Sequence, residues 1–247
     1  MKYYVYISDA KVDMLYSQIP KKMLDKIAVE LGISLGIFSL TAKGKGNQEE
    51  TCYEKLKVVV NYIENNMDVG TIDQPKTYFK GSLPMRWGPL WRDGHEEGKN
   101  LIYFGAETAE TIVGLGGSEY HIIGNQKGES SPRTFMSLPP FMEWALRKEL
   151  DMSLITQRHN DDFNERNLEA NIFSCVVGAT RSMKGAPQHL EFLAKRLREG
   201  SDEAYKPEFL GKPIYFMKNG EPVEPSEEYE KSYHVVLGSP LYVAMVD

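Results

Sequence analysis

The chain lacks the features that would place it in a membrane or in an oxidising compartment. Its 247 residues include only two cysteines, Cys52 and Cys175, which are too few and too far apart for a disulfide framework. No apolar run reaches the ~18 residues of a membrane span. The first residues, Lys2–Ile7, predict a β-strand and lack the apolar core of a signal peptide. We therefore expect a cytoplasmic protein that does not enter a membrane.

The sequence also lacks an excess of positive charge and any recognised catalytic signature. Its net charge of −6 argues against non-specific nucleic-acid binding, which needs a basic surface. There is no zinc-protease motif, Cys-x-x-Cys pair, phosphate-binding Walker loop or nucleophile elbow, and no histidine pair at metal-ligand spacing. The sequence thus identifies neither a cofactor nor a metal site. A negative net charge is nevertheless compatible with a local basic pocket for one small anion.

Strand-like and helical patterns alternate in the first quarter of the chain. Lys2–Ile7 and Ile33–Leu40 predict strands. Apolar spacing predicts a helix from Pro20 to Leu31 and a second helix capped by Thr51. This alternation predicts an α/β (or α+β) fold, with a layered mixed sheet and flanking helices.

The rest of the chain is mostly strand-like. We expect one globular unit over residues 1–247, or two intimate halves, 1–128 and 141–247, joined near the Ser- and Pro-rich segment 129–140. The elements expected here are strands at Thr77–Leu90 (interrupted by Pro84), Asn171–Thr180 and Tyr233–Val246, and a two-residue hairpin turn at Asn219-Gly220.

The most distinctive segment is Leu101–Asn125, in which strand-like runs surround closely spaced glycines. We interpret it as a glycine-rich β-hairpin. Glycine inside a strand marks a bulge, close packing, or a place where a ligand approaches the backbone. The dinucleotide-binding fingerprint is not satisfied, because Glu119 occupies the third glycine position. The ligand interpretation makes Gly114, Gly116, Gly117 and Ser118 candidate ligand-binding residues, and the alternative is a purely structural role in packing.

The segment after the first strand holds candidates for both binding and catalysis. Ligands of layered α/β proteins often bind at the carboxyl ends of strands, where Ser8 and Lys11 lie, although helix capping also explains Ser8. Asp9 and Asp13 are candidates for a general base or metal ligands. His121, beside the glycines, is the candidate general acid, with a packed structural histidine as the alternative.

Two further groups of basic residues are candidates for binding an anion. An arginine and a tryptophan on one segment can clamp a phosphate and stack a flat ring, so Lys80, Arg86 and Trp87 form one group. The alternative is an edge strand protected by its charges. Arg181 and Lys184 precede a predicted helix and form the other group, with a solvated turn as the alternative.

Four segments together resemble a bacterial family of soluble proteins, frequent in actinomycetes, that is known only as a domain of unknown function. They are Tyr4–Leu15, Gly81–Trp87, Tyr103–Gly117 and Leu237–Ala244, and the first carries the motif YxYISDxKVDML. The resemblance spans nearly the whole chain. It implies a bacterial, intracellular, single-unit protein, and it brings no activity that can be carried over to these residues.

Three hypotheses about function follow. The first is binding of a small anionic ligand, such as a nucleotide or a nucleotide-derived signal, through the glycines and the basic residues. The second is a metal-assisted hydrolase or nuclease acting on such a ligand. The third is an interaction or assembly protein, a homo-oligomer in the simplest case, whose aromatic-rich edges form the interface.

Overall fold

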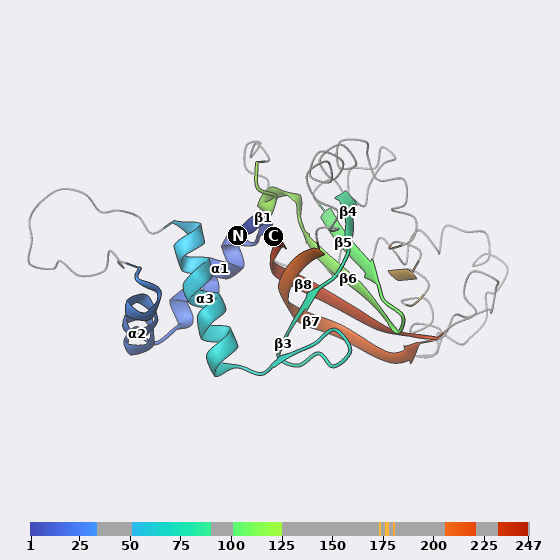
Figure 1. The fold of residues 1–247 in the computed structure, drawn as a ribbon, viewed down its shortest axis with the longest axis horizontal. Helices are drawn as coiled ribbons and strands as arrows, with labels where there is room; N and C mark the ends of the chain where they lie inside the picture. The colour runs from blue at the N-terminus through green and yellow to red at the C-terminus, as the bar shows by residue number, and fades with distance from the viewer. Residues whose placement is uncertain are drawn as a thin grey trace, which may run out of the picture.

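The structure is a computed structural model whose helices lie at one end of a curled sheet (Figure 1). The helices are α1 (Asp9–Gln18), α2 (Lys21–Leu31) and α3 (Cys52–Asn66), and a short 3-10 helix, η2 (Glu119–His121), follows the glycine-bearing strand. The residues that the structure describes are 1–33, 51–89, 101–124, 206–220 and 232–246, together with Phe173, Val176, Val177 and Thr180.

Eight strands in the described ranges form one mixed sheet. The order is β2-β3-β7-β8-β6-β5-β4, and β1 pairs with the last part of β8, beyond the residues that pair with β6. The β6–β8 and β2–β3 pairs are parallel, and the other pairs are antiparallel. A mixed sheet with flanking helices confirms the predicted α/β class. The strands are β1 (Lys2–Ile7), β2 (Val69–Gly70), β3 (Tyr78–Ser82), β4 (Arg86–Pro89), β5 (Leu101–Glu107), β6 (Thr111–Ser118), β7 (Lys206–Gly220) and β8 (Tyr233–Val246).

The sheet curls because a short connection joins two strands that stand far apart in its order. Only residues 83–85 separate β3 from β4, yet β3 is next to one end of the order and β4 is at the other. Three residues span little more than ~10 Å, so the two ends of the sheet must approach each other. The expectation of one interrupted strand at Thr77–Leu90 is therefore replaced by two strands in distant sheet positions.

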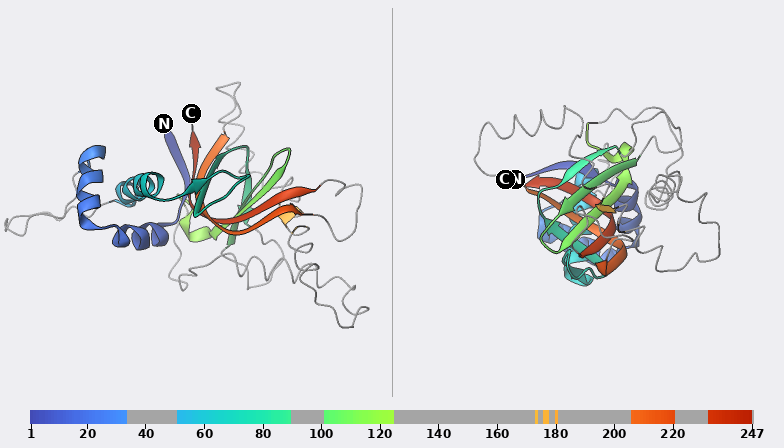
Figure 2. Two further views of the ribbon diagram at one scale, coloured as in Figure 1. Left: turned by 90° about the horizontal axis from the view of Figure 1, so that it is seen from below. Right: turned by 90° about the vertical axis from the view of Figure 1, so that its right-hand side faces the viewer.

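The concave face of the curled sheet encloses a core built from strands at both ends of its order. Phe79 of β3 packs against Phe209 of β7 with ring centroids 5.3 Å apart, and Trp87 of β4 stacks on Phe104 of β5 at 5.8 Å. Tyr6 of β1 joins the same cluster through an edge contact with Phe104. The two views of Figure 2 show the strands wrapping around this interior.

The helices cover the part of the sheet where the two chain ends lie side by side (Figure 1). Buried side chains of α1, α2 and α3, such as Val12, Ile27 and Leu56, share a core cluster with Tyr242 and Ala244 of β8. Apolar residues at helical spacing therefore bury one face of each helix in this shared core, with α2 packed on α3. Within the described ranges, no helix combines the length and the apolar character that crossing a lipid bilayer requires.

The helix boundaries follow local capping chemistry. The Thr51 hydroxyl accepts a hydrogen bond from the Glu54 N–H at 3.3 Å, and the Glu54 carboxylate accepts one from the Thr51 N–H at 2.9 Å, which completes a capping box. Gly32 ends α2 in the left-handed conformation with φ of 65°. The two helices predicted in the first quarter are thus confirmed. The α1 helix was expected only as the capping alternative at Ser8. The helix predicted after Lys184 lies outside the described residues, as does the predicted strand Ile33–Leu40 apart from Ile33.

Two expectations about the later segments are wrong. In the predicted strand Asn171–Thr180, the four described residues are helical. Their spacing of i, i+3, i+4 and i+7 is that of one helix face, which packs on Tyr103 and β8. A two-residue hairpin turn at Asn219-Gly220 is also excluded, because Gly220 pairs directly with Tyr233. The strand expected at Tyr233–Val246 is confirmed by β8.

Candidate functional site

One edge of β8 is shared by two strands that do not meet. The parallel partner β6 pairs as far as Leu115 opposite Gly238, and the antiparallel partner β1 begins with Ile7 opposite Tyr242. Residues 239–241 of β8 therefore have no strand partner on this edge within the described ranges. Backbone carbonyls in such a gap need other hydrogen-bond donors, since a buried unpaired carbonyl is costly.

The gap is filled by the segment that links β1 to α1. The Ser8 N–H donates to the Leu241 carbonyl at 2.9 Å. The Lys11 ammonium donates to the Pro240 carbonyl at 3.1 Å and to the Ser239 hydroxyl. The Lys11 ammonium and the Ser8 N–H thus attach the start of α1 to residues 239–241 of β8.

Lys11 is a largely buried cation whose partners are neutral. It forms no ion pair with any residue that the structure describes, and its hydrogen bonds go to the Ser239 hydroxyl and the Pro240 carbonyl. Burial disfavours the charged form and lowers the pKa of Lys11 to about 8. An ammonium has three donors, so this arrangement leaves one N–H and an uncompensated positive charge for a further acceptor.

Asp9 and His121 form a second polar pair at the same junction. The Asp9 carboxylate oxygen lies 2.5 Å from Nδ1 of His121, and the same oxygen accepts the Ala10 N–H at 2.9 Å. The His121 side chain is 16% exposed, and its ring packs edge-on against Tyr6 with centroids 5.8 Å apart. Nδ1 makes no well-aligned hydrogen bond in this contact, so the contact is a close ion pair when the imidazole is protonated, an arrangement in which a carboxylate assists proton transfer by the ring.

Close packing of Tyr6 on Gly117 holds the end of β1 against the glycine-bearing strand β6. The Tyr6 hydroxyl is buried and lies beside the Ser8 side chain and the Ser118 backbone, but it makes no well-aligned hydrogen bond to a described residue. Burial accordingly raises the pKa of Tyr6. A Cβ atom on Gly117 would lie 2.6 Å from the Tyr6 hydroxyl oxygen, so only glycine permits this approach.

The β6 strand completes the site from the other side of the gap. The Ser239 hydroxyl that contacts Lys11 also donates to the Gly116 carbonyl at 3.3 Å. A continuous series of contacts therefore leads from Lys11 through Ser239 to β6, and from Gly117 through Tyr6 and His121 to Asp9. The predicted site residues that this junction brings together are Ser8, Asp9, Lys11, Gly116, Gly117, Ser118 and His121.

The sequence reasoning missed Tyr6, Ser239 and Pro240. The interruption Gly238-Ser239-Pro240 inside an apolar strand was the available signal, because proline cannot donate to a sheet ladder. Without the pairing of β8, nothing in the sequence indicates that this interruption faces Lys11.

Other predicted site residues lie elsewhere and have partners of their own. Asp13 forms an ion pair with Lys55 of α3 at 2.8 Å, and Lys80 forms one with Glu64 at 2.8 Å. Gly114 lies beneath the Tyr103 ring, where a Cβ would be 2.6 Å from the tyrosine hydroxyl, so its role is close packing. No three histidine, cysteine or acidic side chains gather as a metal site in the described ranges.

Arg86 and Trp87, from the first of the two predicted basic groups, do not join the junction. Arg86 is exposed, and its guanidinium lies 3.5 Å from the Thr180 carbonyl. Trp87 stacks on Phe104 as part of the interior cluster. Arg181 and Lys184 lie outside the described residues.

The fold and the junction define an α/β protein with a curled mixed sheet and a Lys, Asp and His cluster where its first strand ends. A family model matches residues 2–247, and the chain belongs to that family, a family of unknown function (DUF7019). The family match agrees with the resemblance seen in the sequence. Searches of curated proteins and of solved structures return no match.

Proposed function

We propose that the protein binds a small anionic ligand at the junction of β1, β6 and β8, with Lys11 as the residue that neutralises its charge. The observation that carries this proposal is the Lys11 ammonium itself. It is largely buried, and the partners that the structure describes for it are neutral oxygens. A buried charge without a counter-charge is costly, and a bound anion would offset that cost.

The surroundings of Lys11 support the same ligand class. Lys11 lies in the first turn of α1, where the helix dipole favours negative charge. Asp9 and Asp13 are the nearest acidic residues along the chain, and their carboxylates are engaged by His121 and Lys55. The positive charge of Lys11 is therefore the charge that a ligand would meet.

The proposal covers phosphates and carboxylates, of which a nucleotide is one member. The basis for a nucleotide was the pair Arg86 and Trp87, and Trp87 is engaged by Phe104 away from this junction. The base of a nucleotide would therefore need another aromatic side chain on which to stack. Together with the low cysteine content and the resemblance to bacterial proteins, our proposal places this binding in a bacterial cytoplasm.

The test is a titration of the isotope-labelled protein, followed by NMR, with inorganic phosphate, pyrophosphate, small carboxylates and a nucleotide panel. Charge-assisted hydrogen bonds contribute about 1.5–3 kcal/mol, so Lys11→Met should weaken binding by about tenfold or more. Lys11→Arg keeps the charge and should retain part of the affinity. Lys22→Gln, an exposed lysine on α2, is the matched control and should change nothing. Absence of saturable binding across the whole panel would overturn the proposal.

A second candidate function is hydrolysis of the bound ligand, and the Asp9–His121 contact favours it. In this proposal His121 is the general base or acid and Asp9 orients it. The metal-assisted form would require Asp13 to leave Lys55, which holds it at 2.8 Å. Turnover that falls by ~100-fold or more in Asp9→Asn, with ligand affinity retained, would support this function. Binding without turnover, in the presence or absence of divalent metal, would exclude hydrolysis and leave binding as the only function of the two.

A further inference from the structure

A second concave site lies between α3 and the paired ends of β1 and β8. The groove has a volume of about 660 Å³, which is within the range of small-molecule pockets. Its lining includes Tyr4 and Tyr242 from the sheet and Tyr53, Lys57 and Glu64 from α3. None of these residues belongs to the Lys11 junction, so the groove can be considered independently of the proposed function.

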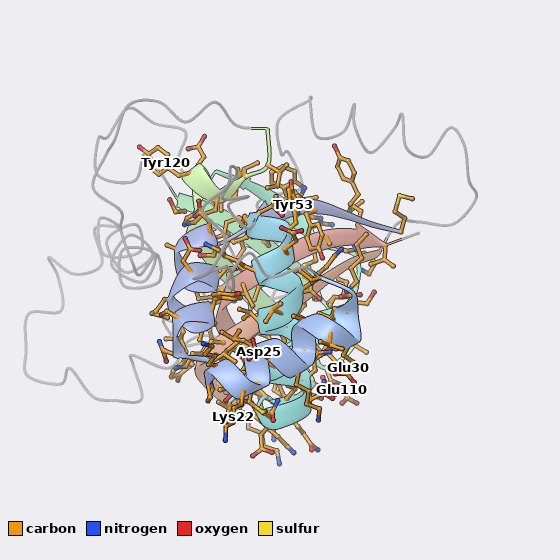
Figure 3. The ribbon with its side chains drawn as sticks, turned by 90° about the vertical axis from the view of Figure 1, so that its left-hand side faces the viewer. Lys22, Asp25, Glu30, Tyr53, Glu110 and Tyr120 are labelled. Carbon is orange, nitrogen blue, oxygen red and sulfur yellow. The ribbon has the colours of Figure 1, made fainter. Side chains whose placement is uncertain are left out.

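The three tyrosines present ring surfaces at steep angles to one another. The Tyr4 ring makes an edge contact with Tyr242 at 5.6 Å between centroids, and a tilted contact with Tyr53 at 5.9 Å. Tyr242 is buried and Tyr53 is 44% exposed, so the aromatic surface runs from the floor of the groove to its mouth. Figure 3 shows Tyr53 near the start of α3, directed away from the helix. A flat ring placed here would contact aromatic side chains from both the helix and the sheet.

The charges around the groove leave one side-chain cation outside the ion pairs of the described residues. The Lys2 ammonium pairs with Glu208 at 2.5 Å, and Glu64 pairs with Lys80 at 2.8 Å. Lys57 forms no ion pair with a residue in the described ranges and is exposed. It is attracted at longer range by Glu54, one turn earlier on α3, but the Glu54 carboxylate is bonded to Thr51 and is not among the lining residues. The unmatched charge of the groove is therefore positive.

The same charges argue against a cationic ligand. The Lys2 ammonium already lies 5.2 Å from the centroid of the Tyr242 ring, where a cation–π ligand would sit. A second cation would meet Lys2 at one end of the groove and Lys57 on α3. We propose that this groove binds a small, flat aromatic molecule that carries one anionic group, its ring against Tyr4 and Tyr53 and its anion at Lys57.

The test compares probes that differ only in ring character or in charge. Phenyl phosphate and benzoate are the aromatic anions, cyclohexanecarboxylate is the anion without an aromatic ring, and benzyltrimethylammonium is the aromatic cation. We expect saturable NMR shifts from the two aromatic anions at residues of α3 and β1. The comparison of phenyl phosphate with benzoate shows whether the anionic group preferred is a phosphate or a carboxylate.

Variants at exposed positions identify the groove without disturbing the core. Tyr53→Leu and Lys57→Gln should each raise the Kd of the aromatic anions by about threefold to tenfold. Lys22→Gln on α2, labelled in Figure 3, and Lys11→Met at the other site should leave it unchanged. Equal affinity for cyclohexanecarboxylate, tighter binding of the ammonium probe, or a Kd that responds to Lys11→Met but not to Tyr53→Leu would overturn the inference. Absence of binding by both aromatic anions would overturn it as well, whereas the Lys11 site would still be tested by inorganic phosphate.

Discussion

Removing the Lys11 charge should change how stability depends on pH. Lys11→Met keeps a long side chain but deletes the ammonium and its hydrogen bonds to Ser239 and the Pro240 carbonyl. At neutral pH the wild-type protein bears the cost of burying a charge, and the variant does not. As the pH rises and Lys11 loses its proton in the folded state, that cost disappears from the wild type.

The sign and size follow from the two pKa values. The ordinary pKa of the lysine side chain is 10.5, and burial lowers that of Lys11 to about 8. Between these values the unfolded chain binds more protons than the folded one, so the free energy of unfolding rises with pH. Each pKa unit corresponds to about 1.36 kcal/mol, which makes the total about 3 kcal/mol. Below pH 8 both states are protonated, and the full cost is present.

The assay is urea denaturation of both proteins from about pH 7 to about pH 11. The free energy of unfolding of the wild type minus that of Lys11→Met should rise by about 3 kcal/mol across this range, because other titrating groups cancel in the difference. Saturating phosphate should flatten the rise, since a bound anion favours the charged amine. A difference that does not change with pH in the absence of phosphate would refute the placement of Lys11 as a buried and uncompensated cation.

Four further substitutions test the packing, the capping and a surface ion pair. Gly117→Ala should lower the free energy of unfolding by about 1–3 kcal/mol in a denaturant titration, because its Cβ would lie 2.6 Å from the Tyr6 hydroxyl oxygen. Tyr6→Leu removes the ring, whose carbons the added Cβ would also meet at 2.7 and 2.8 Å, and should therefore reduce the cost of Gly117→Ala in a double-mutant cycle; additive costs would contradict the contact. Thr51→Ala should cost about 0.5–2 kcal/mol in thermal denaturation by loss of the cap of α3, and no loss would argue against the capping box. Asp13→Asn should cost less than about 1 kcal/mol, because the Asp13 side chain is 60% exposed beside Lys55; a larger cost would indicate a role beyond a surface ion pair.

Local chemistry made some elements predictable. Thr51 and the apolar spacing after it indicated α3, and Gly32 indicated the end of α2, because caps depend on side chains within a few residues. The segment from Phe173 to Thr180 was misassigned because a short apolar run is compatible with either a strand or a helix. Its i, i+3, i+4 spacing supported the helix that the structure shows at the described positions.

The candidate site was predictable as a set of residues but not as a place. Lys11, Asp9 and His121 are the polar residues beside β1 and the glycine strand, so their chemistry was visible. Their proximity was not, because Asp9 and His121 meet only through the pairing of β1 with β8 and the bridge between Tyr6 and Ile122. The packing of Trp87 on Phe104 in the interior cluster likewise depends on the pairing of β4 with β5, which the sequence did not indicate.

The sequence by itself determined the class of fold, most of the helix limits and the types of side chain available for binding, since these depend on neighbours along the chain. Tertiary structure alone decided that β6 and β1 share one edge of β8 and leave a gap between them. That gap needs donors from outside the sheet, and Lys11 and Ser8 supply them. Strand pairing between residues more than 200 positions apart follows from the packing of the whole sheet, which no local pattern encodes.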